Sequence, residues 1–551
     1  MSSTQAATVP VADTFGWDTV YAIRYADVNQ AIVNDWPSPS IRIDQASGPA
    51  SIAGDFQPWR VVTGGGGHLV HMEARVPALL YNGSTTYDAT AEIEVQLEFV
   101  PQPVAGVRGA RLPRGVSGGS WQDLRLKVGA NTAVSIMDVS YTGVAPNDID
   151  KAIIKDLFRI WFNDPANLQN FNTVFVSVNL NAKADVDAFQ WLSPTHVSYA
   201  VAEGGTLPDG IFAVLCMTEN RDATALAHQV SPYAIPEGQR SAFLISPERY
   251  LRKLLMPGIG LMFARPADAG PSKPWPEAYF ELQPDGVTIT NTAEIRIAQL
   301  EVEAGQTREA IIPQAGFAVR LEDTRLAIDF TNMRHDYKHG LLSWLKVDHT
   351  IRSTATATLR EGQKFALDPS DGTPTIVVTK NTTAEWVEIG MISATLLLIS
   401  SGMAMGAYRT YVTGGAVATG NAFTQTAELT DVAAVPDDLA TAEAAQGATG
   451  CLATLGGGLT RSKSLLSAFW QNYRATWFAF ASTGTGGVTS IMKVLELIAN
   501  QKSERFLPEF NEFSAGVMAP VQWPNAQSEF EVKTVAFSRS LQAAGDPGFA
   551  D

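Results

Sequence analysis

The most informative hydrophobic pattern lies at residues 389–408, where twenty residues pass without a charged side chain. A bilayer span needs about 20 apolar residues, but three serines, one threonine and three glycines in this stretch oppose insertion. Its apolar side chains fall on one helical stripe, which comprises Ile392, Leu396, Ile399 and Met403. The pattern predicts a long helix that is buried against a sheet or lines a lipid groove. Plain core packing and membrane insertion remain as alternatives.

Strict alternation of apolar and polar residues predicts strands in two long blocks. Residues 92–99 and 173–180 show the pattern in the first block, and the second block runs from about 277 to 380. Such alternation is typical of antiparallel sheets with one buried and one solvated face. Near the C-terminus, residues 530–541 predict a strand whose inward set slips by one position after Val532, which indicates a β-bulge.

Three further segments carry helical signals. Residues 27–36 predict a helix capped by Asp27, and residues 147–162 predict a helix capped by Asn147 or Asp148. The expected apolar stripe of the second helix comprises Ile149, Ile153, Leu157, Ile160 and Trp161. Ser246-Pro247-Glu248 predicts another helix start, with a cap, a proline at the first position and an acid in the first turn.

Residues 464–481 predict a helix with an aromatic stripe that includes Trp470 and Trp477. Core packing is the default interpretation of this stripe, and a ligand wall or a membrane-interface face is the alternative. Strand blocks and helices segregate with little βαβ alternation, so the fold class is α+β. The chain has 551 residues, which favours two or more domains, or one very elongated domain. We place two domains at residues 10–240 and 241–551, the second with a helical or flexible excursion at about 384–505.

Composition narrows the function classes. The net charge of −16 argues against nucleic-acid binding through a general basic field. Two cysteines are too few for a disulfide framework or a cysteine zinc site. The N-terminal residues lack the basic and apolar regions of a Sec signal peptide. We therefore expect synthesis in the cytosol, and release by a route without Sec export remains open.

Three segments resemble reactive motifs but lack the required context. Residues 115–119 match G-x-S-x-G, yet they lead into a predicted strand, whereas a nucleophile elbow needs a helix there. Residues 63–71 (TGGGGHLVH) lack the Gly-Lys-Ser/Thr ending of a phosphate-binding loop. His335 and His339 are spaced for a helical metal site, but their flanks do not predict a helix. We expect no enzymatic activity, no cofactor and no metal.

Three short landmarks together resemble a known family. They are residues 16–23 (GWDTVYAI), residues 243–258 with FLISP and LLMPG, and residues 521–537 with VQWP followed by a strand. Their order and spacing are similar to the OrfX and P47 group, the accessory proteins encoded beside botulinum-type neurotoxin and related insecticidal toxin genes. That group belongs to the tubular lipid-binding (TULIP) superfamily.

The resemblance implies long curved antiparallel sheets wrapped around long α-helices, in elongated tandem TULIP-like modules with a hydrophobic groove. It implies a non-enzymatic protein that binds a lipid or fatty acid and serves a toxin-type or secretion-type gene cluster. Other cluster-encoded proteins or a membrane surface would be further partners. Lipid-contacting residues are then expected on the apolar helices, at Ile392, Leu396, Ile399, Met403, Trp470 and Trp477. The alternatives are a protein-binding scaffold with a self-filled groove and a membrane-permeabilising toxin component.

Overall fold

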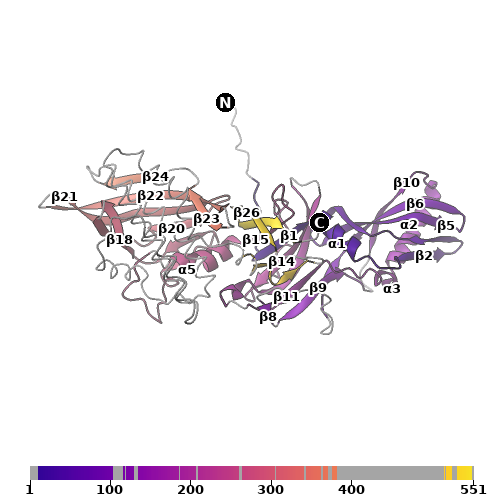
Figure 1. Cartoon of the computed structure of the whole chain (residues 1–551), viewed down its shortest axis with the longest axis horizontal. Coiled ribbons are helices and arrows are strands. Elements are labelled where there is room, and N and C mark those ends of the chain that lie inside the picture. Colours follow the sequence, from indigo (N-terminus) through magenta and orange to yellow (C-terminus); the bar gives the residue numbers. More distant parts are fainter. Residues whose placement is uncertain are drawn as a thin grey trace, which may run out of the picture. The chain divides into compact units, whose positions relative to one another are not determined.

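The computed structural model divides the chain into two compact units (Figure 1). Unit 1 comprises Met1–Tyr250 and Phe510–Asp551, and unit 2 comprises Leu251–Glu509; each is described by itself. The structure describes residues 10–102, 116–117, 119–129, 134–184, 187–205, 209–259, 263–303, 306–339, 343–360, 364–369, 375–380, 514, 517–523 and 530–548.

The central sheet of unit 1 has six antiparallel strands in the order β13-β14-β1-β15-β27-β26. Their bounds are β1 (Thr19–Arg24), β13 (Pro194–Glu203), β14 (Gly210–Thr218), β15 (Ser241–Ile245), β26 (Glu531–Phe537) and β27 (Leu541–Asp546). The last strand of the chain pairs with β15, in register Ile245↔Leu541. The predicted division assigned residues 241–551 to one module, but these C-terminal strands complete the sheet of unit 1.

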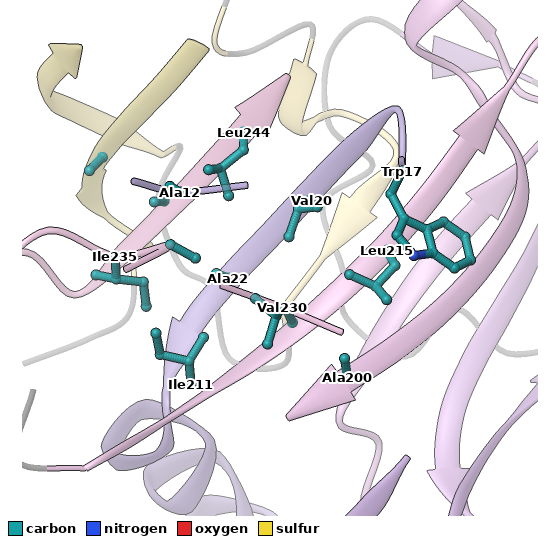
Figure 2. Close-up of a cluster of buried hydrophobic side chains, with 14 of the residues drawn as sticks. Ala12, Trp17, Val20, Ala22, Ala200, Ile211, Leu215, Val230, Ile235 and Leu244 are labelled. Atoms are coloured by element: carbon teal, nitrogen blue, oxygen red, sulfur yellow. The ribbon is translucent and has the colours of Figure 1, made fainter. Parts of the chain in front are cut away.

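Both faces of the central sheet are buried at its middle strands β14, β1 and β15, whereas the edge strand β26 has exposed residues. Every residue of β14 is buried, as expected for a continuous apolar strand covered on both sides. On one face, Trp17, Val230 and Ile235 cover side chains of β1 and β14, as Figure 2 shows. On the other face, Phe212 lies 5.7 Å from Phe175 between ring centroids. The sheet is therefore the core of the unit.

A second sheet in unit 1 has the strand order β10-β6-β5-β3-β2, with β4 added on β5. Its bounds are β2 (Arg42–Ser47), β3 (Ala50–Asp55), β4 (Arg60–Gly66), β5 (Leu69–Tyr81), β6 (Thr85–Val95) and β10 (Ser135–Thr142). Two smaller sheets have the orders β25-β11-β9-β7 and β12-β8. Their bounds are β7 (Leu97–Pro101), β8 (Val116–Ser117), β9 (Ser120–Leu126), β11 (Val176–Leu180), β12 (Lys183–Ala184) and β25 (Val521–Gln522).

The helix α2 (Asp148–Phe162) packs on the second sheet and confirms the predicted helix, with the Asn147 side chain accepting from the backbone N–H of Asp150. The predicted stripe is shifted, because the buried residues are Ile154, Leu157, Phe158, Trp161 and Phe162. Ile149 is instead 75% exposed. The aromatic side chains of the last two turns fill the interior, where Phe56 lies 4.9 Å from Trp161 between ring centroids. This packing sets the orientation of the helix.

The helix α1 (Tyr25–Asn34) begins earlier than predicted, and the expected Asp27 cap is wrong. Arg24 stands at the N-cap without a side-chain hydrogen bond. Asp27 lies in the first turn, where its carboxylate accepts from Arg240 at 2.6 Å. Tertiary pairing with a distant arginine has therefore replaced the local capping interaction.

The predicted helix start at Ser246 is confirmed, since its side chain accepts from the backbone N–H of Arg249. A short α-helix, α4 (Pro247–Arg249), continues as the π-helical η2 (Tyr250–Leu255) and then as α5 (Met256–Ile259). The remaining described helices are α3 (Pro165–Leu168) and the 3₁₀ helix η1 (Asp187–Leu192).

Unit 2 contains a nine-stranded antiparallel sheet along β16-β17-β20-β21-β19-β18, with β22 on β21 and with β23 and β24 on β22. Its bounds are β16 (Phe280–Leu282), β17 (Thr288–Asn291), β18 (Ile295–Glu303), β19 (Gln306–Ile312), β20 (Phe317–Leu321), β21 (Leu326–His339), β22 (Ser343–Arg360), β23 (Lys364–Pro369) and β24 (Thr375–Lys380). Phe263, Phe280 and Phe317 form an aromatic cluster at its core.

The observed architecture confirms antiparallel sheets, and the described part of the chain contains no long helix around which they are wrapped. The longest helix in the described part of the chain is α2, with 15 residues. The sheets are open and do not close into barrels. The long helix predicted at residues 389–408 and the aromatic helix predicted at residues 464–481 both lie outside the described residues.

Candidate functional site

The lipid-contacting residues predicted from the sequence cannot be located in the described structure. All six lie outside the described residues: Ile392, Leu396, Ile399, Met403, Trp470 and Trp477. They therefore stay predictions. The candidate site that the structure does build lies in unit 1, at residues that sequence patterns did not bring together.

The glycine-rich segment at residues 63–71 is a hairpin turn rather than a phosphate cradle. It joins β4 to β5, and the two strands pair around it. Gly64 has a φ of +106°, and a Cβ built there would lie 2.7 Å from Nδ1 of His71. Glycine is required at such a position because it tolerates positive φ and leaves space for the neighbouring ring. The glycines thus let the hairpin close over His71.

His68, at the tip of this hairpin, contacts two residues of other elements. Its Nε2 lies 3.0 Å from the Ser198 hydroxyl oxygen on β13. The same hydroxyl lies 2.8 Å from Nδ1 of His228. The two imidazole ring centroids are 3.7 Å apart with the planes tilted by 38°. We name His68, Ser198 and His228 the histidine clasp.

Backbone and tyrosine contacts fix the clasp in place. Gly67 and Val201 exchange two backbone hydrogen bonds, of 3.1 and 2.9 Å. The Tyr199 hydroxyl accepts from the backbone N–H of Leu97 at 2.7 Å and donates to the His68 carbonyl at 2.8 Å. The clasp thereby joins the β4–β5 hairpin of the second sheet to β13 of the central sheet.

The clasp is an electrostatically unfavourable place for positive charge. Burial lowers the pKa of His68 to about 4, and the neighbouring His228 and Lys127 act in the same direction. Burial also lowers the pKa of His228, with a further contribution from His196. Loss of hydration destabilises an imidazolium, and nearby cations add to that effect. Both rings are therefore neutral at pH 7.

His71 lies in a contrasting environment on the same hairpin. Its Nδ1 is 3.4 Å from a Glu92 oxygen, and its Nε2 is 3.3 Å from a Glu94 oxygen. The two carboxylates lie on opposite sides of the ring, so they cannot bind one metal ion together with it. The two histidines of this segment thus serve different contacts.

A buried ion network lies beside the first residue of β1. Asp18 is fully buried, and one of its oxygens accepts from the backbone N–H and the hydroxyl of Thr218, both at 2.8 Å. Its other oxygen accepts from Arg221 and lies 4.0 Å from Nε of Arg249. Arg249 is 2% exposed and also donates to Glu219 at 2.8 Å. The network ties β1 and β14 to the helix start after β15.

The two most exposed large apolar side chains in the described structure flank the start of α2. Val144 is 79% exposed and Ile149 is 75% exposed. Val144 follows β10, and Ile149 lies in the first turn of α2. In the same turn, Asp150 accepts a hydrogen bond from the Tyr81 hydroxyl at 2.9 Å. We name Val144 and Ile149 the apolar tip.

The other candidate motifs lack the geometry for their chemistry. Val116–Ser117 forms β8, and strand β9 follows, so residues 115–119 do not lead into the helix of a nucleophile elbow. His335 and His339 lie on strand β21, where four residues span roughly 13 Å. The described part of the chain contains no group of three potential metal ligands. Within the same residues, no helix is long and apolar enough to cross a bilayer.

Sequence reasoning missed the clasp because its members are far apart in the chain. His68 and Ser198 are separated by 130 positions, and Ser198 and His228 by 30. Of the segments that form the clasp, only the glycine-rich hairpin with its two histidines stood out in the sequence. The landmarks of the family resemblance, in contrast, come together in space, since β1, β15, β27 and β26 are successive neighbours in the central sheet.

Comparisons with known proteins agree with those landmarks. A family model described as OrfX-like, Protein OrfX2/OrfX3/P47, matches residues 14–451. The chain is 28% identical to Protein OrfX3 of Paraclostridium bifermentans over 282 residues, which are 45% of this chain and 55% of that protein. It is 29% identical to Protein OrfX3 of Clostridium botulinum (strain Kyoto / Type A2) over 283 residues, which are 46% and 55%. The matched region thus spans about half the length of these curated relatives.

A similar solved structure is P47 of Clostridium botulinum E1, with 14% identity, a TM-score of 0.47, and coverage of 71% of this chain and 89% of that one. The family match extends over more than half of the sequence. The chain belongs to the OrfX-like family.

Proposed function

We propose that this chain is a non-enzymatic protein that binds a lipid or another hydrophobic ligand, as an accessory component of a toxin-type or secretion-type gene cluster. The observation that carries the proposal is membership of the OrfX-like family. The resemblance to that family implies a lipid-binding groove. Open antiparallel sheets with extensive apolar faces are compatible with such a groove.

The expected mechanism is burial of acyl chains against apolar side chains. Each buried CH₂ group contributes about 0.8 kcal/mol, so one acyl chain gains useful affinity without a specific polar contact. Leu396 and its neighbours on the predicted helix are the proposed lining. Replacing Leu396 by Asp should abolish the uptake of a fluorescent fatty acid, while Ser401→Asp, on the opposite side of the predicted helix, should retain it. Unchanged uptake by a folded Leu396→Asp variant would contradict this assignment.

Contact with a membrane surface is supported by the apolar tip. Burying Val144 and Ile149 in a bilayer would contribute about 3–6 kcal/mol, which suits weak and reversible attachment. The adjacent Asp148 is 98% exposed and would disfavour anionic lipids. Zwitterionic phosphatidylcholine vesicles are therefore the appropriate probe.

Vesicle flotation tests this contact directly. The double variant Val144→Asp/Ile149→Asp should lose flotation with phosphatidylcholine vesicles. Val33→Asp is the matched control, because Val33 is an exposed apolar residue on α1 of the same unit. Equal flotation of both variants would remove the apolar tip from the proposal. Release of an entrapped dye from the vesicles would favour the permeabilising alternative instead.

A further inference from the structure

We propose that the histidine clasp is an acid-sensitive latch, which holds the β4–β5 hairpin against β13 at neutral pH and releases it in acid. The inference goes beyond lipid binding and does not depend on it. It rests on the contacts among His68, Ser198 and His228 and on the charges that surround them.

The serine proton of the clasp requires an unprotonated imidazole as its acceptor. Ser198 has one hydroxyl proton, and its oxygen contacts one ring nitrogen of each histidine. In the neutral arrangement, one imidazole donates to the hydroxyl oxygen and the other accepts the hydroxyl proton. When both rings are protonated, both nitrogens are donors and the serine proton has no acceptor in the pair. Acid therefore reverses donor and acceptor in one hydrogen bond of the clasp and leaves the buried serine proton without an acceptor among the three clasp residues.

Acid also places like charges in contact. The two ring centroids are 3.7 Å apart, so two imidazolium ions would repel each other strongly. Lys127, which follows β9, and His196, on β13, add positive charge from neighbouring elements. Tyr199, which also faces His68, stays neutral, because burial raises its pKa to about 12.

Asp222 is an acidic residue that interacts with a histidine beside the clasp rather than with the clasp itself. Asp222 interacts with His196 and with the backbone and side chain of Thr224. Its carboxylate contributes nothing to the hydrogen bonds between Ser198 and the two rings. In the part of the chain that the structure describes, neither ring of the clasp has a carboxylate beside it of the kind that Glu92 and Glu94 give to His71.

The position of the clasp gives its opening a structural consequence. Two backbone hydrogen bonds between Gly67 and Val201 and one hydrogen bond from Tyr199 to His68 complete the contact. Ser198 is 7% exposed and Tyr199 is 4% exposed while the hairpin covers them. Release of the hairpin would expose this part of β13 and separate the second sheet from the central sheet along that edge.

Hydrogen exchange between pH 7.5 and pH 4.5, corrected for the intrinsic rate, tests the latch in the full-length protein. Peptides that contain Gly67 and Val201 should lose protection as the pH falls, with an opening constant that rises by up to about tenfold per pH unit for each histidine that takes up a proton on opening. In the double variant His68→Gln/His228→Asn, uncharged amide groups replace Nε2 of His68 and Nδ1 of His228. The protection of these peptides in the double variant should not depend on pH. His71→Gln, on the same hairpin outside the clasp, should behave like the wild-type protein.

Protection of these peptides that is independent of pH in the wild-type protein would overturn the proposal. The same pH dependence in the double variant would also overturn it. If the double variant does not fold, the wild-type protein is modified with diethyl pyrocarbonate at a series of pH values. Peptide mass spectrometry then measures how the modification of His68 depends on pH, and this result decides the question. A midpoint well below 6.5 supports the latch, and a midpoint at or above 6.5 contradicts it.

Discussion

Replacing Asp18 by Ala should strongly destabilise unit 1, because the substitution removes a fully buried carboxylate from the ion network that it forms with Arg221 and the buried Arg249. The carboxylate is fully buried and accepts from Thr218 and Arg221, and the guanidinium of Arg249 lies close to it. Removing one member of a buried ion pair typically costs about 3–5 kcal/mol. We expect the free energy of unfolding of unit 1 to fall by about that amount.

The thiol of Cys216 provides a specific readout of this loss. Cys216 is fully buried in β14, and its carbonyl accepts from the backbone N–H of Asp18 at 3.0 Å. Pulsed thiol labelling in urea, resolved by peptide mass spectrometry, therefore follows the unfolding of unit 1 without interference from unit 2.

Asp148→Ala is the matched control for Asp18→Ala. The Asp148 side chain is 98% exposed and forms only a surface pair with Lys151 among the described contacts. Surface pairs contribute at most about 1 kcal/mol. If Asp18→Ala costs no more than this control, the buried network does not stabilise the junction of β1, β14 and the helix start, and the reasoning is refuted.

Three further predictions concern the same unit. Trp161→Ala should lower the free energy of unfolding by about 3–5 kcal/mol in urea titrations, because the ring fills the interior beside Phe56; a loss below 1 kcal/mol would contradict the packing. Gly64→Ala should cost about 1–3 kcal/mol in the same assay, through positive φ and the contact with His71, and a neutral effect would count against the hairpin geometry. The pKa of His68 is lower in the folded state than in the unfolded state, so the unfolded chain takes up the proton first as the pH falls. The contribution of neutral His68 to the free energy of unfolding is therefore complete above about pH 6.5 and is lost as the pH falls to about 4. A pKa shift from 6.5 to about 4 corresponds to at most about 3.4 kcal/mol of folding free energy, and solvent screening of a partly exposed ring reduces this to about 1–2 kcal/mol. His68→Gln should remove this loss from the pH profile of stability.

Local patterns predicted local structure well. Asn147 caps α2 and Ser246 caps α4, because both signals lie within one turn of the helix start. The slip after Val532 is also confirmed, since the register of β26 against β27 shifts between Val532 and Thr534. In each case the pattern and the contact that enforces it are a few residues apart.

Long-range contacts decided what the patterns missed. The apolar face of α2 is displaced from the predicted stripe, because Phe158 and Phe162 fill the aromatic interior while Ile149 lies beyond the sheet. The pairing of β27 with β15 joins segments almost 300 positions apart, and no periodicity encodes such a partner. The histidine clasp has the same origin, since it forms only when the hairpin meets β13.

The predicted helix at residues 389–408 could be argued only from its own periodicity and from the family resemblance. It lies outside the described residues, so the proposed lining of the lipid groove is independent of the geometry of unit 1. The candidate site in unit 1 is likewise independent of the proposed ligand. The two claims can therefore fail separately.

Native mass spectrometry of the purified full-length protein, followed by organic extraction, tests the central claim most directly. The account predicts an adduct on the intact chain and a phospholipid or fatty acid in the extract. A bare protein that also fails to float with phosphatidylcholine vesicles would contradict lipid binding and would favour the protein-binding scaffold.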